Sequence, residues 1–251
     1  MSAAPLTFDG AWNAVSGVEG WMSEGQGRAL FDAAAACRSD GHIVEIGSFR
    51  GRSTIVLALA APVGATVIAI DPHAGTDRGP REIDGFEVEA GDDHEVFQAN
   101  LRAAGVHHRV RHVREFSDRA LGIVTGEIDL LYVDGAHRYG PARADIHEWG
   151  SRVRPGGSLL IHDSFSSIGV TSAIMRELLV SNRFRYVGRS RSLAIYRAID
   201  EHDEAGRAAN ALRQLAQLPW FAKNVTTKVL LTIGVDRLYR GLGRDAPEWP
   251  Y

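Results

Sequence analysis

Short apolar runs alternate with helical patterns along most of the chain. Apolar runs bounded by glycine, proline or charged residues predict strands at 42–47, 65–71, 109–115, 128–133 and 158–161. Apolar residues at helical spacing predict helices at 25–37, 53–60, 94–104, 118–124, 141–149 and 168–180. Strands that alternate with helices form parallel sheets covered on both faces, so the pattern predicts an α/β fold.

The pattern changes after residue 180. Two further strands, 184–187 and 193–199, are joined by a short polar turn, which predicts a hairpin and an antiparallel edge. Helices are expected at 205–218 and 223–239, docked on the domain, on a twin subunit or over a ligand pocket. The expected fold is Rossmann-like and doubly wound, with a mostly parallel seven-stranded sheet, helices on both faces and a helical C-terminal extension. The expected divisions are 1–40, 41–200 and 201–251.

Composition narrows the class of protein. The chain has 251 residues, of which 45% are hydrophobic and 24% charged, and its net charge is −3, so nothing in it favours nucleic acid or an anionic membrane. A single cysteine, Cys37, excludes an internal disulfide. The longest apolar run, 55–70, contains Pro62 and Gly64, which argues against a membrane span. The first residues lack a signal-peptide pattern, and we expect a cytoplasmic protein.

Two segments lack a regular pattern. Residues 1–25 contain Trp12 and Trp21 among small residues. This segment is expected to form either a lid over a ligand site or an arm packed on the core. Residues 72–93 read as a long polar loop, and a loop of that length in a compact domain is usually functional or mobile.

A glycine-containing turn follows the first predicted strand. Its spacing, Gly47-x-x-x-Gly51, is neither the dinucleotide fingerprint nor a phosphate-binding P-loop. Asp71 ends the second predicted strand, 24 residues after Gly47, where an acid accepts both hydroxyls of a ribose. The glycine turn, which lacks a phosphate-binding pattern, and Asp71 together favour a ligand with an adenosine but no phosphates. S-adenosylmethionine is such a ligand. The alternative is a tight turn with Asp71 as a helix cap.

Polar side chains also follow two later strands. Asp134 and His137 come after the strand at 128–133, and His162 and Asp163 come after the strand at 158–161. The carboxyl ends of neighbouring parallel strands form the crevice in which ligands bind, so these four side chains are expected to converge. The alternatives are an Asp-Gly turn, a capping pair for the next helix and a surface histidine.

These motifs together resemble a known family. The segments are Val44-Glu-Ile-Gly-Ser-Phe-Arg-Gly-Arg-Ser-Thr54, Ile68-Ala-Ile-Asp71, Phe97-x-x-Asn100-Leu, Asp134-Gly-Ala-His137-x-Tyr139, Pro155-Gly-Gly157 and His162-Asp163. They resemble class I S-adenosylmethionine-dependent methyltransferases. Within that class the chain is similar to metal-dependent O-methyltransferases of sugars and antibiotic glycosides, over residues 17–199.

The resemblance implies a set of cofactor contacts. The methionine and ribose portions would lie along Glu45, Gly47, Ser48 and Gly51, with Ser53 assisting from the helix start. Asp71 would hold the ribose hydroxyls, Ser117 would lie near adenine, and Asp134 would face the sulfonium.

The resemblance also implies a divalent cation, with Mg²⁺ as the first choice. Asp134 and Asp163 would hold it, with His162 as a third ligand or a supporting partner, while His137 and Asp134 would be catalytic and His137 the base. Relatives often carry two acids, or Asp-Asn, where this chain has His162-Asp163. Mg²⁺ prefers oxygen and an imidazole favours a later transition metal, so the role of His162 stays open. Glu82, Asp84 and Glu87 are candidate remote oxygen ligands.

The expected activity is methyl transfer from S-adenosylmethionine to a sugar hydroxyl, assisted by a divalent cation. The resemblance points towards polysaccharide methylation, with the 1-hydroxyl of a methylmannoside as the specific acceptor. The alternatives are an O-methyltransferase of a phenolic or antibiotic small molecule and a non-catalytic S-adenosylmethionine-binding module. The expected partner is a small-molecule or oligosaccharide acceptor, without nucleic acid or membrane insertion, and a homodimer is compatible with the apolar tail.

Overall fold

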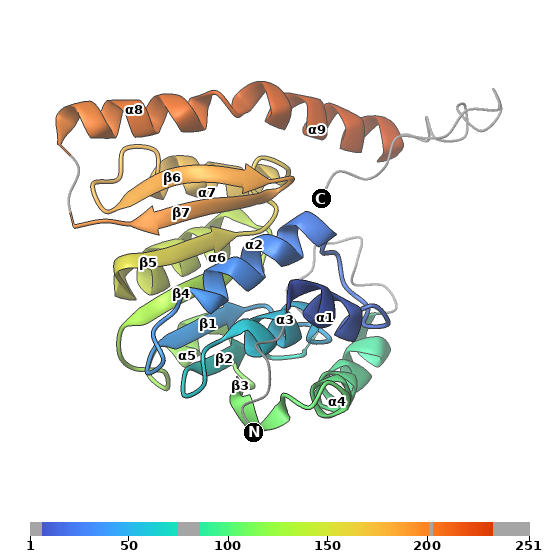
Figure 1. Cartoon of the computed structure of the whole chain (residues 1–251). Helices are drawn as coiled ribbons and strands as arrows, with labels where there is room; N and C mark the ends of the chain where they lie inside the picture. Colours follow the sequence, from blue (N-terminus) through green and yellow to red (C-terminus); the bar gives the residue numbers. More distant parts are fainter. Residues whose placement is uncertain (1–6, 75–85, 201–202, 233–251) are drawn as a thin grey trace.

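The computed structural model describes residues 7–74, 86–200 and 203–232. Its centre is a seven-stranded sheet with the order β3-β2-β1-β4-β5-β7-β6 (Figure 1). Strands β1 to β5 are parallel, and β7 runs antiparallel to both β5 and β6, as the hairpin signal predicts. The strands are β1 (His42–Ile46), β2 (Thr66–Ile70), β3 (Val110–Val113), β4 (Ile128–Val133), β5 (Val153–Ile161), β6 (Phe184–Ser190) and β7 (Leu193–Ala198).

Helices cover both faces of this sheet, as predicted. Apolar residues of α2 (Glu24–Ala35), α3 (Arg52–Ala60) and α4 (Phe86–Ala103) pack on one face, and α1 (Phe8–Ala14) contacts α2 and α3. The other face is covered by α5 (Ser117–Ala120), α6 (Tyr139–Ala144) with its continuation Asp145–Trp149, and α7 (Ile168–Glu177). Helices α8 (Glu204–Leu215) and α9 (Leu218–Thr232) form the C-terminal extension (Figure 1).

Side-chain alternation along the strands decides which face each residue joins. Leu130, Tyr132 and Leu160 belong to the core under α2 and α3, whereas Leu131 and Leu159 belong to the opposite core. Successive residues of a strand point to opposite faces. Asp134 and His162 continue the alternation of Leu130, Tyr132 and Leu160 past the strand ends, so their side chains lie on the α2 side of the sheet.

The strand order reverses next to β1. From β1 the chain moves outward through β2 to β3, and it then returns to place β4 on the other side of β1. Such a switch point leaves a crevice at the carboxyl ends of the two central strands. The loops that begin with Gly47 and Asp134 meet there, where the Asp134 N–H donates to the carbonyl of Ile46 at 2.8 Å.

Several boundaries differ from the sequence expectation. Helix α4 begins at Phe86, so the predicted loop at 72–93 is wrong in its last eight residues. Helix α1 was not expected, because its seven residues give too short a pattern to detect. Strand β5 begins at Val153 instead of 158, although Pro155 interrupts its apolar pattern. Among the described residues, no helix is long and apolar enough to span a bilayer.

The C-terminal extension docks on the domain, one of the three arrangements expected for it. Trp220 and Phe221 pack against the core on the α7 side of the sheet. The Asn210 side chain accepts a hydrogen bond from the backbone N–H of Tyr186 at 2.7 Å. The buried Asn224 amide donates to the carbonyl of Phe165 at 3.0 Å, which brings α9 to the loop after β5.

Candidate active site

Strained backbone marks the carboxyl edge of the sheet. Phe49, His73, Asp163 and Phe165 all have positive φ values, between 44° and 55°. They follow strands β1, β2 and β5 at the same end of the sheet. Non-glycine residues rarely adopt this conformation, and such strain concentrates at functional sites. The strain and the topological crevice therefore point to one location.

The glycine loop after β1 lies directly against the loop after β4. Gly47 has a φ of +86°, and a Cβ atom there would lie 2.2 Å from the carbonyl oxygen of Asp134. Gly51 has a φ of +88° and precedes the first residue of α3. Both positions require glycine, one for close approach and one for the turn into the helix.

A buried carboxylate stands behind this loop. Glu45 is fully buried, and the hydroxyls of Ser53 and Thr54 donate to its two oxygens. Burial raises the pKa of Glu45 to about 8 although these two hydrogen bonds lower it. Ser53 was among the expected site residues, whereas Thr54 was not, although its hydroxyl donates to the same carboxylate from the next position on α3.

Asp71 pins the glycine loop to the end of β2. Its carboxylate accepts the backbone N–H of Phe49 at 2.8 Å and that of His73 at 2.7 Å. Asp71 therefore contacts the loop itself and caps no described helix. The nearby hydroxyl of Ser48 and both ring nitrogens of His73 are buried without a protein hydrogen-bond partner. Unpartnered buried polar atoms beside a held carboxylate fit a polar ligand such as the ribose of S-adenosylmethionine.

Ser117 begins α5, directly after β3, and so belongs to the same edge. Its side chain is hydrogen-bonded to the buried carboxyl of Asp145, and burial raises the pKa of that carboxyl to about 6. Asp145 begins a π-helical stretch that continues α6. Such π-helical irregularities are frequent at functional sites. Asp145 was not among the expected site residues.

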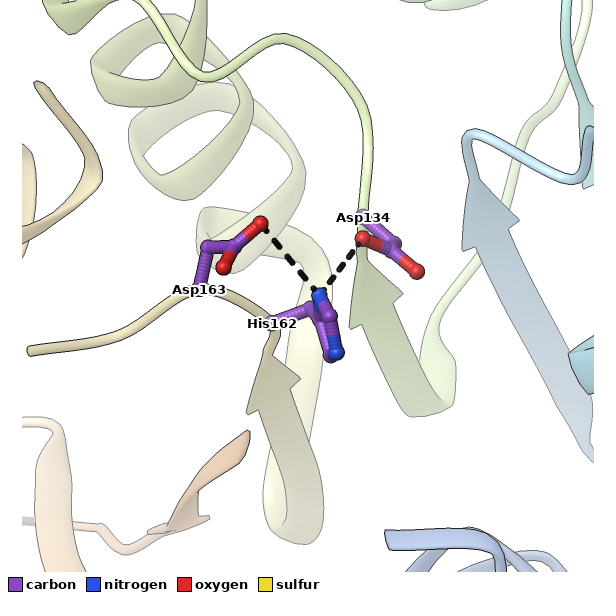
Figure 2. A group of neighbouring side chains, drawn as sticks. All are labelled: Asp134, His162 and Asp163. Carbon is purple, nitrogen blue, oxygen red and sulfur yellow. Dashed lines mark ion pairs between the residues drawn. The ribbon is translucent and has the colours of Figure 1, made fainter. Parts of the chain in front are cut away.

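Three predicted metal ligands come together after β4 and β5 (Figure 2). His162 Nδ1 lies 3.1 Å from Asp134 Oδ1 and 3.5 Å from Asp163 Oδ2. The Tyr132 hydroxyl donates to Asp134 Oδ2 at 2.7 Å. Burial lowers the pKa of His162, but the two neighbouring carboxylates outweigh burial and raise it well above its ordinary value.

His137 joins this group through Asp163. Its Nε2 atom lies 3.0 Å from Asp163 Oδ2, and its side chain remains 57% exposed. The hydrogen bond to Asp163 raises the pKa of His137, and the partial desolvation of the ring offsets only part of this effect. The carbonyl of His137 accepts the hydroxyl of Ser167 at 3.3 Å, and a Cβ at Gly169 would lie 2.2 Å from that carbonyl oxygen. The start of α7 therefore holds the His137 backbone in place.

The donor set fits a divalent cation. One ligand atom from each of Asp134, His162 and Asp163 lies within 4.8 Å of the other two. Two carboxylates this close repel each other unless a positive charge or hydrogen-bond donors compensate them. The remote candidates Glu82 and Asp84 lie outside the described residues, as does the side chain of Glu87.

The N-terminal segment packs on the core and also borders the site. Trp12 packs against Gly27 of α2, as an arm would, and the guanidinium of Arg52 lies over its ring. Trp21 is 53% exposed and lies 5.4 Å from the ring of Phe49 on the glycine loop. An exposed aromatic ring therefore borders the site.

One protein-family model matches the part of the chain that contains these residues. A family model described as a methyltransferase domain matches residues 44–164, which run from β1 through the cluster after β5. The match identifies residues 44–164 as a methyltransferase domain and supports an S-adenosylmethionine-dependent enzyme. The matched segment contains the candidate residues Glu45 and Asp163 near its two ends.

Solved structures share the fold of this chain at low sequence identity. Cofactor-bound Rv0187 from MTB has a TM-score of 0.54 and 21% identity, and the match covers 78% of this chain and 88% of that one. The O-methyltransferase TomG from Streptomyces achromogenes, solved with S-adenosylmethionine, has a TM-score of 0.52 and 19% identity over 76% and 89%. The O-methyltransferase NovP has a TM-score of 0.57 and 15% identity over 70% and 81%.

Proposed function

We propose that this methyltransferase transfers the methyl group to a sugar hydroxyl with the help of a divalent cation. The observation that carries the proposal is the His137–Asp163 contact of 3.0 Å, beside a second carboxylate and next to the glycine loop. An O-methyltransferase needs a base for the acceptor hydroxyl and a group that polarises it. These residues supply both functions in one place.

His137 is the proposed general base. Its Nε2–H donates to Asp163, so the remaining lone pair is on Nδ1, and the exposed side chain can present that nitrogen to an acceptor. Nδ1 would take the hydroxyl proton as the acceptor oxygen bonds to the methyl carbon, while the bond between that carbon and the sulfonium sulfur breaks and S-adenosylhomocysteine leaves as a neutral thioether. Asp163 then faces the imidazolium that results, which stabilises it. A positioned base contributes about 10²–10⁴-fold to the rate.

Asp134 and Asp163 are the proposed ligands of the cation, with Mg²⁺ as the first choice. Carboxylate oxygens are the ligands that Mg²⁺ prefers. When bound, the cation would polarise the acceptor hydroxyl and lower the cost of its deprotonation. Tyr132 would fix the Asp134 carboxylate by its hydrogen bond to Oδ2.

The glycine loop and Asp71 are the proposed cofactor contacts. When bound, S-adenosylmethionine supplies an activated methyl group on its sulfonium sulfur. Gly47 and Gly51 leave the backbone accessible, Ser48 offers a buried hydroxyl without a partner, and Asp71 offers a carboxylate held by two N–H groups. The buried Glu45 holds the start of α3, directly after the loop, through the hydroxyl of Ser53.

The proposed acceptor is a sugar. The sequence resemblance favours sugars, and it narrows them to the 1-hydroxyl of a methylmannoside in a polysaccharide. The exposed ring of Trp21 supports this choice, because aromatic faces bordering a site can pack against a sugar ring. The name of TomG connects that protein with tomaymycin synthesis, which keeps an antibiotic or phenolic acceptor as the second candidate.

The decisive experiment is methyl transfer from labelled S-adenosylmethionine to methylmannosides, other short sugars and catechols, each with and without EDTA. Labelling of a sugar that EDTA abolishes would support every part of the proposal. Labelling of catechols alone would exclude a sugar acceptor and favour a phenolic one. Labelling that resists EDTA would remove the cation and leave the His137–Asp163 pair as the base. Cofactor binding without any labelling would favour the non-catalytic alternative.

A further inference from the structure

The inner face of the C-terminal extension is largely polar. Asn210 and Gln214 of α8 and Asn224 of α9 are buried. Apolar side chains of the same two helices are exposed instead, namely Leu212, Leu215, Leu218, Val229 and Leu230. A surface helix ordinarily buries its apolar stripe and exposes its polar face. Apart from the packing of Trp220 and Phe221 on the core, the extension reverses this arrangement.

The polar inner face has a physical reason in the sheet. Strand β6 lies at the edge, so the outer backbone groups of this strand have no neighbouring strand to pair with. The Asn210 side chain replaces that strand: its oxygen accepts the N–H of Tyr186 at 2.7 Å, and its nitrogen donates to the carbonyl of Phe184 at 3.2 Å. The Gln214 amide donates to the carbonyl of Leu178, after α7, at 3.1 Å. Hydrogen bonding to these backbone groups uses the polar face and leaves the aliphatic residues outside.

The exposed residues form one stripe along both helices. From residue 208 they recur every three or four positions, at 208–209, 212–213, 215–216, 218–219, 222–223, 226 and 229–230. This is the spacing of a single helix face, and α8 and α9 follow one another in nearly a line beyond β6 (Figure 1). We call this surface the outer stripe. A contiguous exposed apolar surface marks a site of contact with a protein or a membrane.

The charge of this segment is entirely basic. Residues 205–231 contain Arg207, Arg213, Lys223 and Lys228 and no aspartate or glutamate. The acids nearest in sequence precede the outer stripe at the start of α8, where Glu204 lies 4.0 Å from Arg207. Arg213 and Lys223 are exposed members of the stripe itself. The stripe therefore matches an apolar partner that carries negative charge, although the whole chain has a net charge of −3.

A shallow cavity of about 540 Å³ opens beside the outer stripe. It lies between β6 and α8, where Arg213 and Ala216 of the stripe line it together with Arg189 and Val187. The Arg189 guanidinium donates to the side-chain oxygen of Gln217 at 2.9 Å, which holds it at the cavity. Guanidinium groups bind phosphate oxygens through charge-assisted hydrogen bonds. The cavity can therefore take the phosphate of a lipid headgroup next to the exposed aliphatic residues.

We propose that the outer stripe of α8 and α9 binds the surface of an anionic lipid bilayer. The aliphatic residues enter the boundary between headgroups and acyl chains, while Arg213 and Lys223 extend along their apolar stems to the phosphates. Helices of this kind lie in the plane of the surface and do not cross the bilayer. The outer stripe is separate from the active site, so the inference does not depend on the acceptor or the cation proposed above.

Charge decides between a bilayer and a second copy of the chain. Two copies joined through the outer stripe would bring their exposed Arg213 and Lys223 side chains to one interface, and the stripe contains no acid to compensate them. Nucleic acid would compensate the charge but would leave the leucines without an apolar partner. An anionic bilayer satisfies both the apolar and the basic residues.

The experiment is sedimentation of the full chain with two kinds of vesicle. One kind is pure phosphatidylcholine, and in the other phosphatidylglycerol replaces a third of that lipid. We expect the chain to sediment with the anionic vesicles only, and high salt to release part of it, because salt screens the basic residues but not the aliphatic ones. Light scattering without lipid reports whether the chain dimerises.

Two double variants separate the aliphatic and basic contributions. Leu212→Ser with Leu215→Ser removes side chains that are 66% and 40% exposed, which together amount to about one leucine and roughly tenfold in affinity for the anionic vesicles. Arg213→Gln with Lys223→Gln removes two charges, and each contributes about fivefold near an anionic surface. Both variants should keep the thermal unfolding midpoint of the wild type, because the replaced side chains are exposed.

Val63→Ser with Arg102→Gln is the matched control, since it replaces one aliphatic and one basic residue that are exposed outside the extension. This variant should sediment like the wild type. A chain that does not sediment with anionic vesicles, that sediments equally with both kinds, or whose sedimentation neither double variant reduces would overturn the inference. A dimer that Leu212→Ser with Leu215→Ser dissociates would also overturn it, because a second copy would then cover the outer stripe.

Discussion

Gly47 and Asp134 meet where the loops after β1 and β4 converge. A Cβ atom at position 47 would lie 2.2 Å from the carbonyl oxygen of Asp134 and 2.8 Å from the Cα of Gly135. The proposed cofactor loop and the proposed catalytic loop are thus in direct backbone contact. A displacement of one must displace the other.

Gly47→Ala is therefore expected to affect both stability and cofactor binding. The left-handed backbone alone costs a non-glycine residue about 1–3 kcal/mol, and the overlap with Asp134 adds to it. Gly105→Ala is the control, because Gly105 also has a positive φ but would place its Cβ in open space. Denaturant unfolding and calorimetry with S-adenosylmethionine should show a larger loss in Gly47→Ala. Equal losses of stability and affinity in the two variants would show that the close approach of position 47 to the Asp134 carbonyl has no effect of its own.

Asp71→Ala should weaken cofactor binding. It removes a carboxylate that is held in place by the N–H groups of Phe49 and His73. Hydrogen bonds to a charged group contribute about 1.5–3 kcal/mol, which corresponds to roughly 10–100-fold in the dissociation constant. Asp92→Ala changes an exposed acid of α4 and should have no effect. Unchanged affinity in Asp71→Ala would remove the ribose assignment.

His137→Ala should lower kcat by about 10²–10⁴-fold and leave cofactor affinity intact. His147→Ala is the control and should keep normal turnover. Like His137, His147 is an exposed histidine beside a carboxylate: its side chain is 58% exposed and lies 2.9 Å from the Glu177 carboxylate, away from the site. The wild-type rate should also rise with pH through a value above the ordinary histidine pKa of about 6.5, because Asp163 raises the pKa of His137. Near-normal turnover in His137→Ala would exclude the base role.

Gly169→Ala should disturb the backbone that carries His137. Alanine normally stabilises a helix relative to glycine by about 1 kcal/mol. A Cβ at position 169 would, however, lie 2.2 Å from the carbonyl oxygen of His137, whereas one at Gly140 of α6 would meet nothing within 4 Å. We therefore expect Gly140→Ala to keep full activity and Gly169→Ala to lose activity or stability. Thermal unfolding and initial rates of the two variants make the comparison.

A buried histidine, His73, and a half-buried one, His112, lie next to Asp71 and should make the fold sensitive to acid. Burial lowers the pKa of His112 to about 4, and the pKa of His73 is lowered for the same reason. The unfolded chain binds these protons near pH 6.5, so stability is complete above that pH and falls as the pH drops towards 4.

The test is denaturant unfolding between pH 4 and 7. His112→Gln should flatten the loss of stability over this range, and His107→Gln, at an exposed position, should not. A wild-type stability that stays constant over the range would contradict the assignment.

Much of the site could be predicted because the alternation of strands and helices is visible in short stretches of sequence, and it determines which strand ends lie at the same edge of the sheet. Four site residues lie at or directly after the carboxyl end of a strand whose apolar run is visible in the sequence: Glu45, Asp71, Asp134 and His162. Parallel strands bring these ends to one edge of the sheet. The start of α4 was misplaced because its first residues, Phe86-Glu-Val-Glu-Ala-Gly, are interrupted by glycine and acids. The bordering position of Trp21 depends on its contact with Phe49, which no local pattern encodes.

By itself, the sequence determined the class of the fold, the order of its elements and the loops that carry the chemistry, since hydrophobic periodicity and glycine spacing act over a few residues. Only the tertiary structure decided which partners these groups have. The contact of Gln26 with His162 spans 136 positions and follows from a capping box that happens to face the end of β5. Hydrogen bonds between such distant residues depend on packing distances of a few ångströms, which a linear pattern cannot specify.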